Sequence, residues 1–224
     1  MTSRAALSLR AGNSAALARY VARQLDSQFP AEGVNADAEQ IAELLPRALE
    51  RLRPILAAVR NFEPGAFNHF NSLQYASFLY LLGNEQWRAR PTDALADRLF
   101  CLNRALNSID LFYAVQMPEV FFLSHGLGAV LGNATYGERC VFFQNVTVGR
   151  VAAARPVIGR NVVLYPGAVV TGNAVIGDGC VIAAGTIVHG ERIESDHVAR
   201  TSAGGLVLTP RKRDYASLYF RDAT

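Results

Sequence analysis

The sequence predicts an α+β chain in which an α-helical N-terminal domain is followed by a parallel β-helix. Apolar residues recur at helical spacing before about residue 118 and at a spacing of six residues after it. The chain has 224 residues, of which 50% are hydrophobic and 18% charged, and this suffices for one large or two small globular domains. We therefore divide it into a helical domain at 1–117, a β-helix at 118–205 and a C-terminal tail at 206–224.

The N-terminal half contains four sets of apolar residues that predict α-helices, and all but the third show regular three- and four-residue steps. They are Leu17, Val21 and Leu25; Ile41, Leu45, Leu49, Leu52, Leu56 and Val59; Leu73, Phe78, Leu79 and Leu82; and Leu95, Leu99, Leu102, Leu106 and Ile109. We expect Pro46 and Pro54 to kink or restart the second helix. Gly83-Asn84 should end the third helix, and residues 61–69 should form a loop between helical hairpins.

The C-terminal half is organised by a repeat of six residues. Its first large apolar positions are Val130, Tyr136, Phe142 and Val148, and after a short insertion at 150–157 they continue at Ile158, Leu164, Val170, Ile176, Ile182 and Val188. The residues four positions after the last six are Val162, Ala168, Ala174, Cys180, Thr186 and Arg192. All but the last of these are small, as a narrow interior corner requires.

A six-residue repeat builds a short strand and a tight turn, and three such units close one triangular coil of a parallel β-helix. Stacked coils lie about 4.8 Å apart and bury a continuous aliphatic column. Ten large positions make somewhat more than three coils, preceded by a strand near 120–124. A β-sandwich of short strands is the alternative, but it would show a period of two and longer turns.

Composition excludes several classes of function. The net charge is +3, and no dense basic stripe with interleaved aromatics marks a nucleic-acid surface. Three cysteines without a CxxC pair argue against a disulfide framework or a zinc knuckle. No apolar run approaches the length of a transmembrane helix, and the N-terminus lacks the pattern of a signal peptide. We therefore expect a cytoplasmic protein that does not enter a membrane.

Three segments give the C-terminal half a family resemblance. The repeats resemble the left-handed β-helix of hexapeptide-repeat acyltransferases, most of which are trimers that use acetyl-CoA. The order of helical domain, strand, histidine and coils resembles serine O-acetyltransferase. Residues 122–132 (FLSHGLGAVLG), 144–149 (QNVTVG) and 201–204 (TSAG) resemble that family's catalytic-histidine segment, its next-coil motif and its cofactor loop. The resemblance implies a left-handed β-helix, an acetyl-CoA co-substrate, a homotrimer and possible assembly into a dimer of trimers.

The chain also departs from the family pattern at three positions. The family has an aspartate immediately before the catalytic histidine, where this chain has Ser124. Its second functional histidine corresponds to Arg155, and a further acidic residue corresponds to Gln116. In the family these residues orient the histidine and hold the amino and carboxyl groups of serine. The acceptor is therefore open to question, while the machinery of acetyl transfer is retained.

The resemblance assigns His125 as the general base. Transfer of an acyl group from a thioester to an alcohol needs a base, and an imidazole with a pKa near 6.5 can take the proton and return it to the thiolate. Asp110, Glu119 and a backbone carbonyl are the candidates for its orienting partner, and we select Glu119. Asn145 is a candidate donor to the oxyanion, with a purely structural corner position as the alternative.

A groove that takes the thin pantetheine arm of CoA requires small residues along its wall. Ala183, Ala184 and Gly185, and further on Ala203, Gly204 and Gly205, meet this requirement, with coil packing as the alternative reading of the first three. The basic run Arg211-Lys212-Arg213 follows them, and we expect Arg211 and Lys212 to bind the CoA phosphates. Arg155 is the candidate ligand of a carboxylate or phosphate on the acceptor.

The other histidines are interpreted as structural. His69 is expected to be a surface or capping residue, His189 to face solvent and His197 to lie in the exit loop of the β-helix. A metal site shared between subunits, as found in carbonic anhydrases of this fold, would need three converging histidines, and we expect no metal. The three cysteines are expected to be packed, and the apolar tail at 215–220 to pack on a neighbouring subunit.

These observations predict an acetyl-CoA-dependent O-acetyltransferase that acts through a ternary complex, because no activated serine or cysteine pairs with His125. The alternatives are an N-acetyltransferase acting on an amino sugar or another amine, and a non-catalytic trimeric scaffold.

Overall fold

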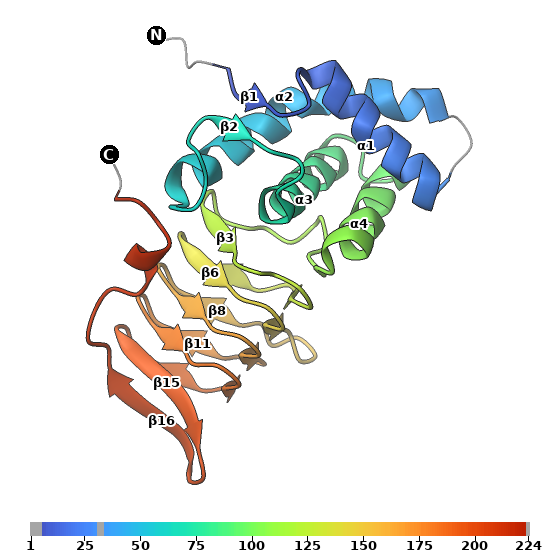
Figure 1. The fold of residues 1–224 in the computed structure, drawn as a ribbon. Coiled ribbons are helices and arrows are strands. Elements are labelled where there is room, and N and C mark those ends of the chain that lie inside the picture. The colour runs from blue at the N-terminus through green and yellow to red at the C-terminus, as the bar shows by residue number, and fades with distance from the viewer. Residues whose placement is uncertain (1–5, 31–33, 223–224) are drawn as a thin grey trace. The chain divides into compact units, whose positions relative to one another are not determined.

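The computed structural model describes residues 6–30 and 34–222 of the chain. They form two compact units, Met1–Asn107 and Ser108–Thr224. The first is helical and the second is a parallel β-solenoid (Figure 1), as the sequence predicts. The division falls ten residues before the expected boundary, because Ile109, Asp110 and their neighbours pack and pair within the solenoid. None of the described helices is long and apolar enough to cross a bilayer.

The helical unit consists of four helices that bury most of the predicted stripes, except that Leu106 is 39% exposed and Ile109 lies beyond the end of the fourth helix. The helices are α1 (Ser14–Gln28), α2 (Val34–Ala58), α3 (Ser72–Ala89) and α4 (Ala94–Asn107). Asn13 caps α1 by accepting a hydrogen bond from the Ala16 amide, and Asn71 caps α3 in the same way. Leu17, Val21 and Leu25 are fully buried, which confirms the first and weakest stripe.

Two expected interruptions do not end their helices. Helix α2 runs through Pro46 and Pro54, and α3 continues past Gly83 to Ala89. Tertiary contacts outweigh the local preference in α3, where Asn84 is fully buried and accepts a hydrogen bond from Arg51. A glycine within a helix costs only about 1 kcal/mol, which burial of a few neighbouring side chains offsets.

The segment 61–69 contains a strand in addition to the expected loop. β2 (Ala66–Phe67) pairs in parallel with β1 (Ser8–Leu9), so the chain just before α1 lies beside the chain just before α3. Phe67 is buried against Phe78, with ring centroids 5.0 Å apart. This small sheet determines where the residues immediately after each strand lie.

The solenoid has three faces, built by strands that stack from coil to coil. The strands are β3 (Phe121–Leu123), β4 (Val130–Leu131), β5 (Thr135–Tyr136), β6 (Cys140–Phe142), β7 (Thr147–Gly149), β8 (Val157–Ile158), β9 (Val163–Leu164), β10 (Val169–Thr171), β11 (Val175–Ile176), β12 (Val181–Ile182), β13 (Ile187–His189), β14 (Arg192–Ile193), β15 (His197–Ser202) and β16 (Gly205–Pro210). The faces are β3-β6-β9-β12-β15-β16, β4-β7-β10-β13 and β5-β8-β11-β14. These make four coils closed by a hairpin.

The six-residue register is confirmed from Tyr136 to Val188, because every predicted large position in this range is buried. The first position is wrong. Val130 is 41% exposed, whereas Leu131 is 1% exposed and lies opposite Val148 in the next coil. Leu131 and Tyr136 are only five positions apart, so counting back by six from Tyr136 gives Val130, a residue on the outer face.

The expected small interior residues are also confirmed in position. Val162, Ala168, Ala174, Cys180 and Thr186 are buried at successive corners, and Arg192 is exposed. The next inward residues are Ile193 and Ala199. Backbone N–H groups along the strands donate to carbonyls of the next coil, as Val141 does to Val162 and Val163 does to Cys180.

The C-terminal segment packs on the solenoid of its own chain, contrary to the expectation that it covers a neighbour. β16 pairs antiparallel with β15, and residues 211–222 then return along the face that contains β3. Tyr219 lies against Phe122, Phe143 and Tyr165, and Phe220 is fully buried under the guanidinium of Arg139. The hydrophobicity of the tail is thus satisfied within the protomer.

Candidate active site

One edge of the solenoid contains His125 and most of the predicted site residues. This edge, here the His125 edge, consists of the turns 124–129, 143–146, 165–168 and 183–186, each of which joins a strand of the β3 face to a strand of the β4 face. Backbone hydrogen bonds stack them: Asn145 N–H to Leu127 O, 2.9 Å; Gly167 N–H to Gln144 O, 3.0 Å; and Gly185 N–H to Pro166 O, 2.9 Å. His125, Asn145 and the small residues at 183–185, which the sequence predicts separately, therefore follow one line.

The turn that holds His125 is larger than the turns stacked beneath it. Six residues separate Leu123 from Val130, whereas four separate each of the equivalent pairs, which are Phe142 and Thr147, Leu164 and Val169, and Ile182 and Ile187. The two additional residues bulge away from the prism, since the strands on either side keep their pairing. His125 lies in this bulge, and its backbone takes a left-handed φ of 51°.

Residues from before the solenoid hold this enlarged turn in place. Gly128 N–H donates to Ser108 O, and the Asp110 backbone pairs with Val130. Ile109 packs under the turn so closely that a Cβ on Gly126 would lie 2.8 Å from its Cδ1. The segment 108–110 thus acts as an extra strand beside β4, and of the two carboxylates considered for His125 it places Asp110 beside this turn.

The imidazole of His125 is exposed and open to a ligand. Among the residues that the structure describes, none forms a hydrogen bond with its side chain. Ser124, which replaces the aspartate of the family pattern, is 5% exposed, and its amide donates to Phe142 O. The geometry therefore presents His125 at the prism surface without an intramolecular partner for either ring nitrogen.

Asn145 is positioned over the His125 turn from the next coil. It has a φ of 57°, and the equivalent residues of the other turns are glycines with similar angles, namely Gly128, Gly167 and Gly185. Asparagine tolerates this conformation better than other residues with a side chain. Its amide oxygen lies against Gly128. A Cβ added to Gly128 would lie 2.3 Å from this oxygen. The corner role and the oxyanion role proposed for Asn145 are therefore compatible.

Gln144, next to Asn145, is a polar residue of this edge that the sequence did not single out. Its Oε1 is buried and has no hydrogen-bond partner among the described residues. An unpaired buried acceptor is unfavourable by about 1–3 kcal/mol unless a ligand or water satisfies it. Gln144 begins the motif at 144–149, but the motif alone gives this glutamine no role, because glutamine is an ordinary residue in a surface turn.

The small-residue wall lies on the same edge, two coils beyond Asn145. Ala184 and Gly185 are exposed, and a Cβ on Gly185 would meet no atom within 4 Å. Ala203 and Gly204 form the tip of the β15–β16 hairpin. Thr201 links the hairpin to the turn at 183–186, because its amide donates a hydrogen bond of 3.2 Å to Thr186 Oγ1. The open space along this wall is suited to a thin chain-like ligand.

Three of the predicted site residues lie at a different edge of the prism. Glu119 precedes β3 and His125 follows it, so about 15 Å of extended chain separates them, beyond the reach of the two side chains. The amides of Glu119 and Val120 donate hydrogen bonds to the two carboxylate oxygens of Glu138. Arg211 and Lys212 follow β16, whose other end is at the hairpin tip, and Arg211 forms ion pairs with Asp196 and Asp214.

Arg155 lies at the third edge. It follows a small hairpin in which Val151 pairs with Ala154, inserted between β7 and β8, and its side chain is exposed. His189 is exposed as expected and contacts Thr171 Oγ1 at 3.0 Å, and His197 contacts backbone carbonyls. Among the described residues, no three histidine, cysteine or acidic side chains converge as a metal site.

The cysteines of the solenoid are unsuited to nucleophilic catalysis. Cys140 and Cys180 are fully buried, and their thiols donate to the carbonyls of Gly159 and Glu194. Burial raises the pKa of Cys140 to about 12 and also raises the pKa of Cys180. Since the thiolate is the reactive form, acyl transfer through either residue is disfavoured.

The fold and the repeat define a hexapeptide-repeat protein. Residues 155–190 match the family described as bacterial transferase hexapeptide (six repeats). The fold is that of serine acetyltransferases: the enzyme from Vibrio cholerae O1 superposes with a TM-score of 0.70 at 22% identity, covering 91% of this chain and 82% of that one. A serine acetyltransferase solved in complex with CoA gives a TM-score of 0.67 at 19% identity, covering 87% and 84%.

The sequence is also similar to curated serine acetyltransferases. The protein from Synechococcus elongatus is 34% identical over 77 residues, which cover 32% of this chain and 32% of that protein. The matched regions span less than half the length of each of the curated relatives. The chain thus has the fold of serine acetyltransferases, carries the hexapeptide repeat at residues 155–190, and is similar in sequence to these enzymes over part of its length.

Proposed function

We propose that this protein is an acetyl-CoA-dependent O-acetyltransferase in which His125 is the general base. The observation that carries the proposal is the His125 edge, on which the exposed imidazole, Asn145 and the open wall at Ala183, Ala184 and Gly185 follow one another from coil to coil. The base and the small-residue wall are then elements of one continuous groove.

In the proposed reaction, the imidazole of His125 takes the proton from the acceptor hydroxyl as its oxygen attacks the thioester carbonyl. The side-chain amide of Asn145 donates to the oxyanion of the tetrahedral intermediate. The C–S bond then breaks, and the imidazolium returns the proton to the departing thiolate. The acetyl group moves directly between the two substrates, since the buried Cys140 and Cys180 are poor nucleophiles.

The wall at Ala183–Gly185 and the hairpin tip at Ala203 and Gly204 are the proposed site of the pantetheine arm. Their exposure and the open space above Gly185, Gly204 and Gly205 fit a narrow ligand without steric conflict. A solved relative of this fold binds CoA, which supports a CoA thioester as co-substrate. Arg211 and Lys212 lie at another edge, so in this proposal they meet the CoA phosphates only from a neighbouring protomer of a trimer.

The acceptor is proposed to be a small molecule with a hydroxyl group. Ser124 and Arg155 stand where the serine enzymes have an acidic residue and a histidine, so the pocket favours an acceptor other than free serine. Arg155, exposed on the hairpin after β7, is the proposed ligand for an anionic group on the acceptor. Like Arg211, it lies at a different edge from His125 and would act across a protomer boundary.

Release of free CoA from acetyl-CoA, measured with a panel of alcohols and amines, tests the proposal. We use His125→Asn for the base, because asparagine accepts the left-handed backbone at this position. Turnover with an alcohol should fall at least about 100-fold in His125→Asn and remain unchanged in His189→Asn, an exposed histidine at the end of β13.

The other outcomes separate the remaining functions. Turnover confined to amines identifies an N-acetyltransferase that uses the same base. The absence of both turnover and CoA binding identifies a scaffold. Sedimentation analysis tests the assembly: a trimer, or a dimer of trimers, is expected, and a monomer contradicts the groove between protomers.

A further inference from the structure

The pairing of β1 with β2 brings two residues of the helical unit together outside the solenoid. Arg10 follows β1, and its amide donates to Phe67 O at the end of β2. His69 lies two residues beyond Phe67. No sequence pattern links them, because Arg10 and His69 are 59 positions apart.

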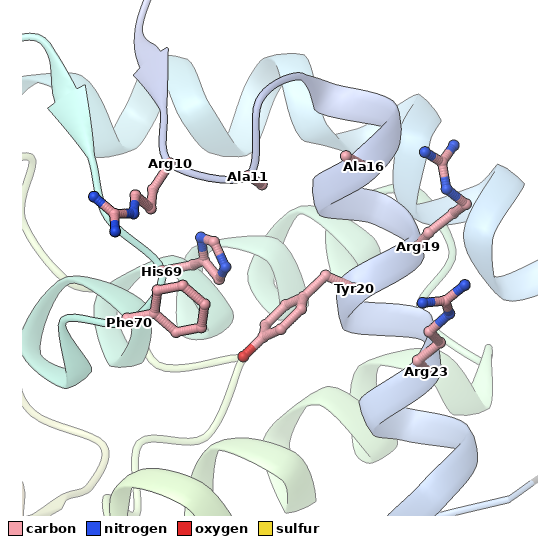
Figure 2. Close-up of a pocket in the computed structure, with 8 residues that line it drawn as sticks. All are labelled: Arg10, Ala11, Ala16, Arg19, Tyr20, Arg23, His69 and Phe70. Atoms are coloured by element: carbon pink, nitrogen blue, oxygen red, sulfur yellow. The ribbon is translucent and has the colours of Figure 1, made fainter.

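A pocket of about 400 Å³ opens beside this pair, between the β2–α3 connection and α1. Arg10, His69 and Phe70 line one side of it, and Arg19 and Arg23 project from α1 on the other, with the ring of Tyr20 between them (Figure 2). The volume suits a small-molecule ligand. We refer to it as the Arg10 pocket.

The Arg10 pocket is positively charged without compensation. Its lining contains three arginines and no acidic residue. Within residues 6–30 and 34–222, Arg10, Arg19 and Arg23 form no ion pair, whereas Arg51, Arg90 and Arg98 of the same unit each contact a carboxylate within 3.0 Å. Guanidinium groups gathered around a concave surface favour an oxyanion, which they bind through paired N–H donors.

His69 provides an independent sign of a ligand. It was expected at the surface, but it is 7% exposed and packs edge-on against Tyr20 and in contact with Phe70. Its Nδ1 is buried and has no partner among the described residues. Burial and the charge of Arg10 lower the pKa of His69, which favours the neutral ring. A bound anion would satisfy Nδ1 and offset the charge of Arg10.

We propose that the Arg10 pocket is a binding site for a small polyanion, either a phosphorylated or a polycarboxylate metabolite. Arg10, Arg19 and Arg23 supply the charge, and His69 supplies a hydrogen bond at the base of the pocket. Phe70, which is 67% exposed, offers an aromatic face to the rest of the ligand. The site belongs to the helical unit and does not depend on the function proposed for the solenoid.

Calorimetric titration of the full-length chain with pyrophosphate and with citrate, at physiological ionic strength, tests this proposal. One site per chain is expected for at least one of the two anions, and the tighter of them identifies the class of the natural ligand. Arg10→Ala and Arg19→Ala should each weaken binding at least about tenfold, because each removes charge-assisted hydrogen bonds. Arg47→Ala, an exposed arginine of α2 outside the pocket, is the matched control and should leave the affinity unchanged.

A second readout follows His69 itself. In NMR titrations of the imidazole, an anion concentration that just saturates the wild type should raise the pKa of His69, and the same concentration should raise it less in Arg10→Ala. The proposal is overturned if neither anion binds at millimolar concentration, or if Arg10→Ala and Arg19→Ala bind as tightly as Arg47→Ala. Binding that is lost in His125→Asn instead assigns the anion to the solenoid and also overturns it. Loss of acetyl transfer alone bears only on the proposed function.

Discussion

The side-chain oxygen of Asn145 occupies the space beside Gly128 that any larger residue at position 128 would need. A Cβ added to Gly128 would lie 2.3 Å from Asn145 Oδ1, and no real pair of such atoms is that close. Gly128 and His125 belong to the same enlarged turn. The contact therefore couples the position of Asn145 to that of the turn that presents the proposed base.

Gly128→Ala should displace Asn145 and so impair both stability and turnover. The new methyl group meets Asn145, and the backbone φ of 72° adds strain of about 1–2 kcal/mol. Gly167→Ala is the control, since its φ is 71° but its Cβ would meet only atoms at 3.8 Å. Urea unfolding should show a larger decrease in the free energy of unfolding for Gly128→Ala than for Gly167→Ala. Equal losses would mean that Asn145 moves aside freely.

Asn145→Gly separates the corner role of Asn145 from its proposed oxyanion role. Glycine accepts the φ of 57° without strain, so the melting temperature should change little. If the amide donates to the oxyanion, kcat should fall about 100-fold while KM stays nearly constant. Asn161→Gly, at a φ of 56° on another edge, serves as the control for loss of an asparagine side chain. An unchanged kcat in Asn145→Gly would leave only the corner role.

The fold was predictable because burial in a solenoid repeats with the sequence. Each coil contributes one large inward residue per face, so the period appears directly in the chain, and Tyr136 through Val188 follow it. The prediction failed at Val130 because local coil lengths vary by one or two residues. Such changes leave the strand pairing intact but shift which residue faces inward.

The site was only partly predictable, because spacing along the chain does not reveal which edge a residue occupies. His125, Asn145 and Gly185 fall on one edge since each follows a strand of the same face. Glu119 and Arg211 are close in sequence to site segments, but they lie at the other ends of β3 and of the β15–β16 hairpin. His69 could not be recognised, because its burial depends on the pairing of two strands of two residues each.

Thiol reactivity should distinguish the three cysteines. Cys140 and Cys180 are fully buried, and the pKa of Cys140 is raised to about 12, so almost no thiolate is present at pH 8. Cys101 is partly exposed. Mass spectrometry after brief treatment of the native protein with iodoacetamide should show alkylation of Cys101, with the other two modified only after unfolding. Comparable labelling of Cys140 in the native protein would indicate that the first coils open readily.

Tyr219 should stabilise the solenoid through its ring and make that stability sensitive to high pH. The ring packs on Phe122 and Phe143 but is only partly buried, so Tyr219→Ala should lower the free energy of unfolding by about 1–3 kcal/mol, and Leu218→Ala, at a more exposed site, by well under 1 kcal/mol. Tyr219→Phe removes only the hydrogen bond to the Tyr165 hydroxyl, and a loss near 1 kcal/mol is expected.

The pH dependence follows from the direction in which folding moves the phenol. Burial, with a further contribution from the hydrogen bond to Tyr165, raises the pKa of Tyr219 above 10. Below pH 10 the phenol is neutral in both the folded and unfolded states, so its contribution to the free energy of unfolding does not change with pH. Above pH 10 the unfolded chain loses the proton first, and stability falls with rising pH until the folded phenol also ionises. In urea unfolding, the free energy of unfolding should therefore decrease more between pH 8 and pH 10.5 for the wild type than for Tyr219→Phe. Equal drops would mean that Tyr219 ionises in the folded protein as it does in water, and that the tail does not hold its ring against the solenoid.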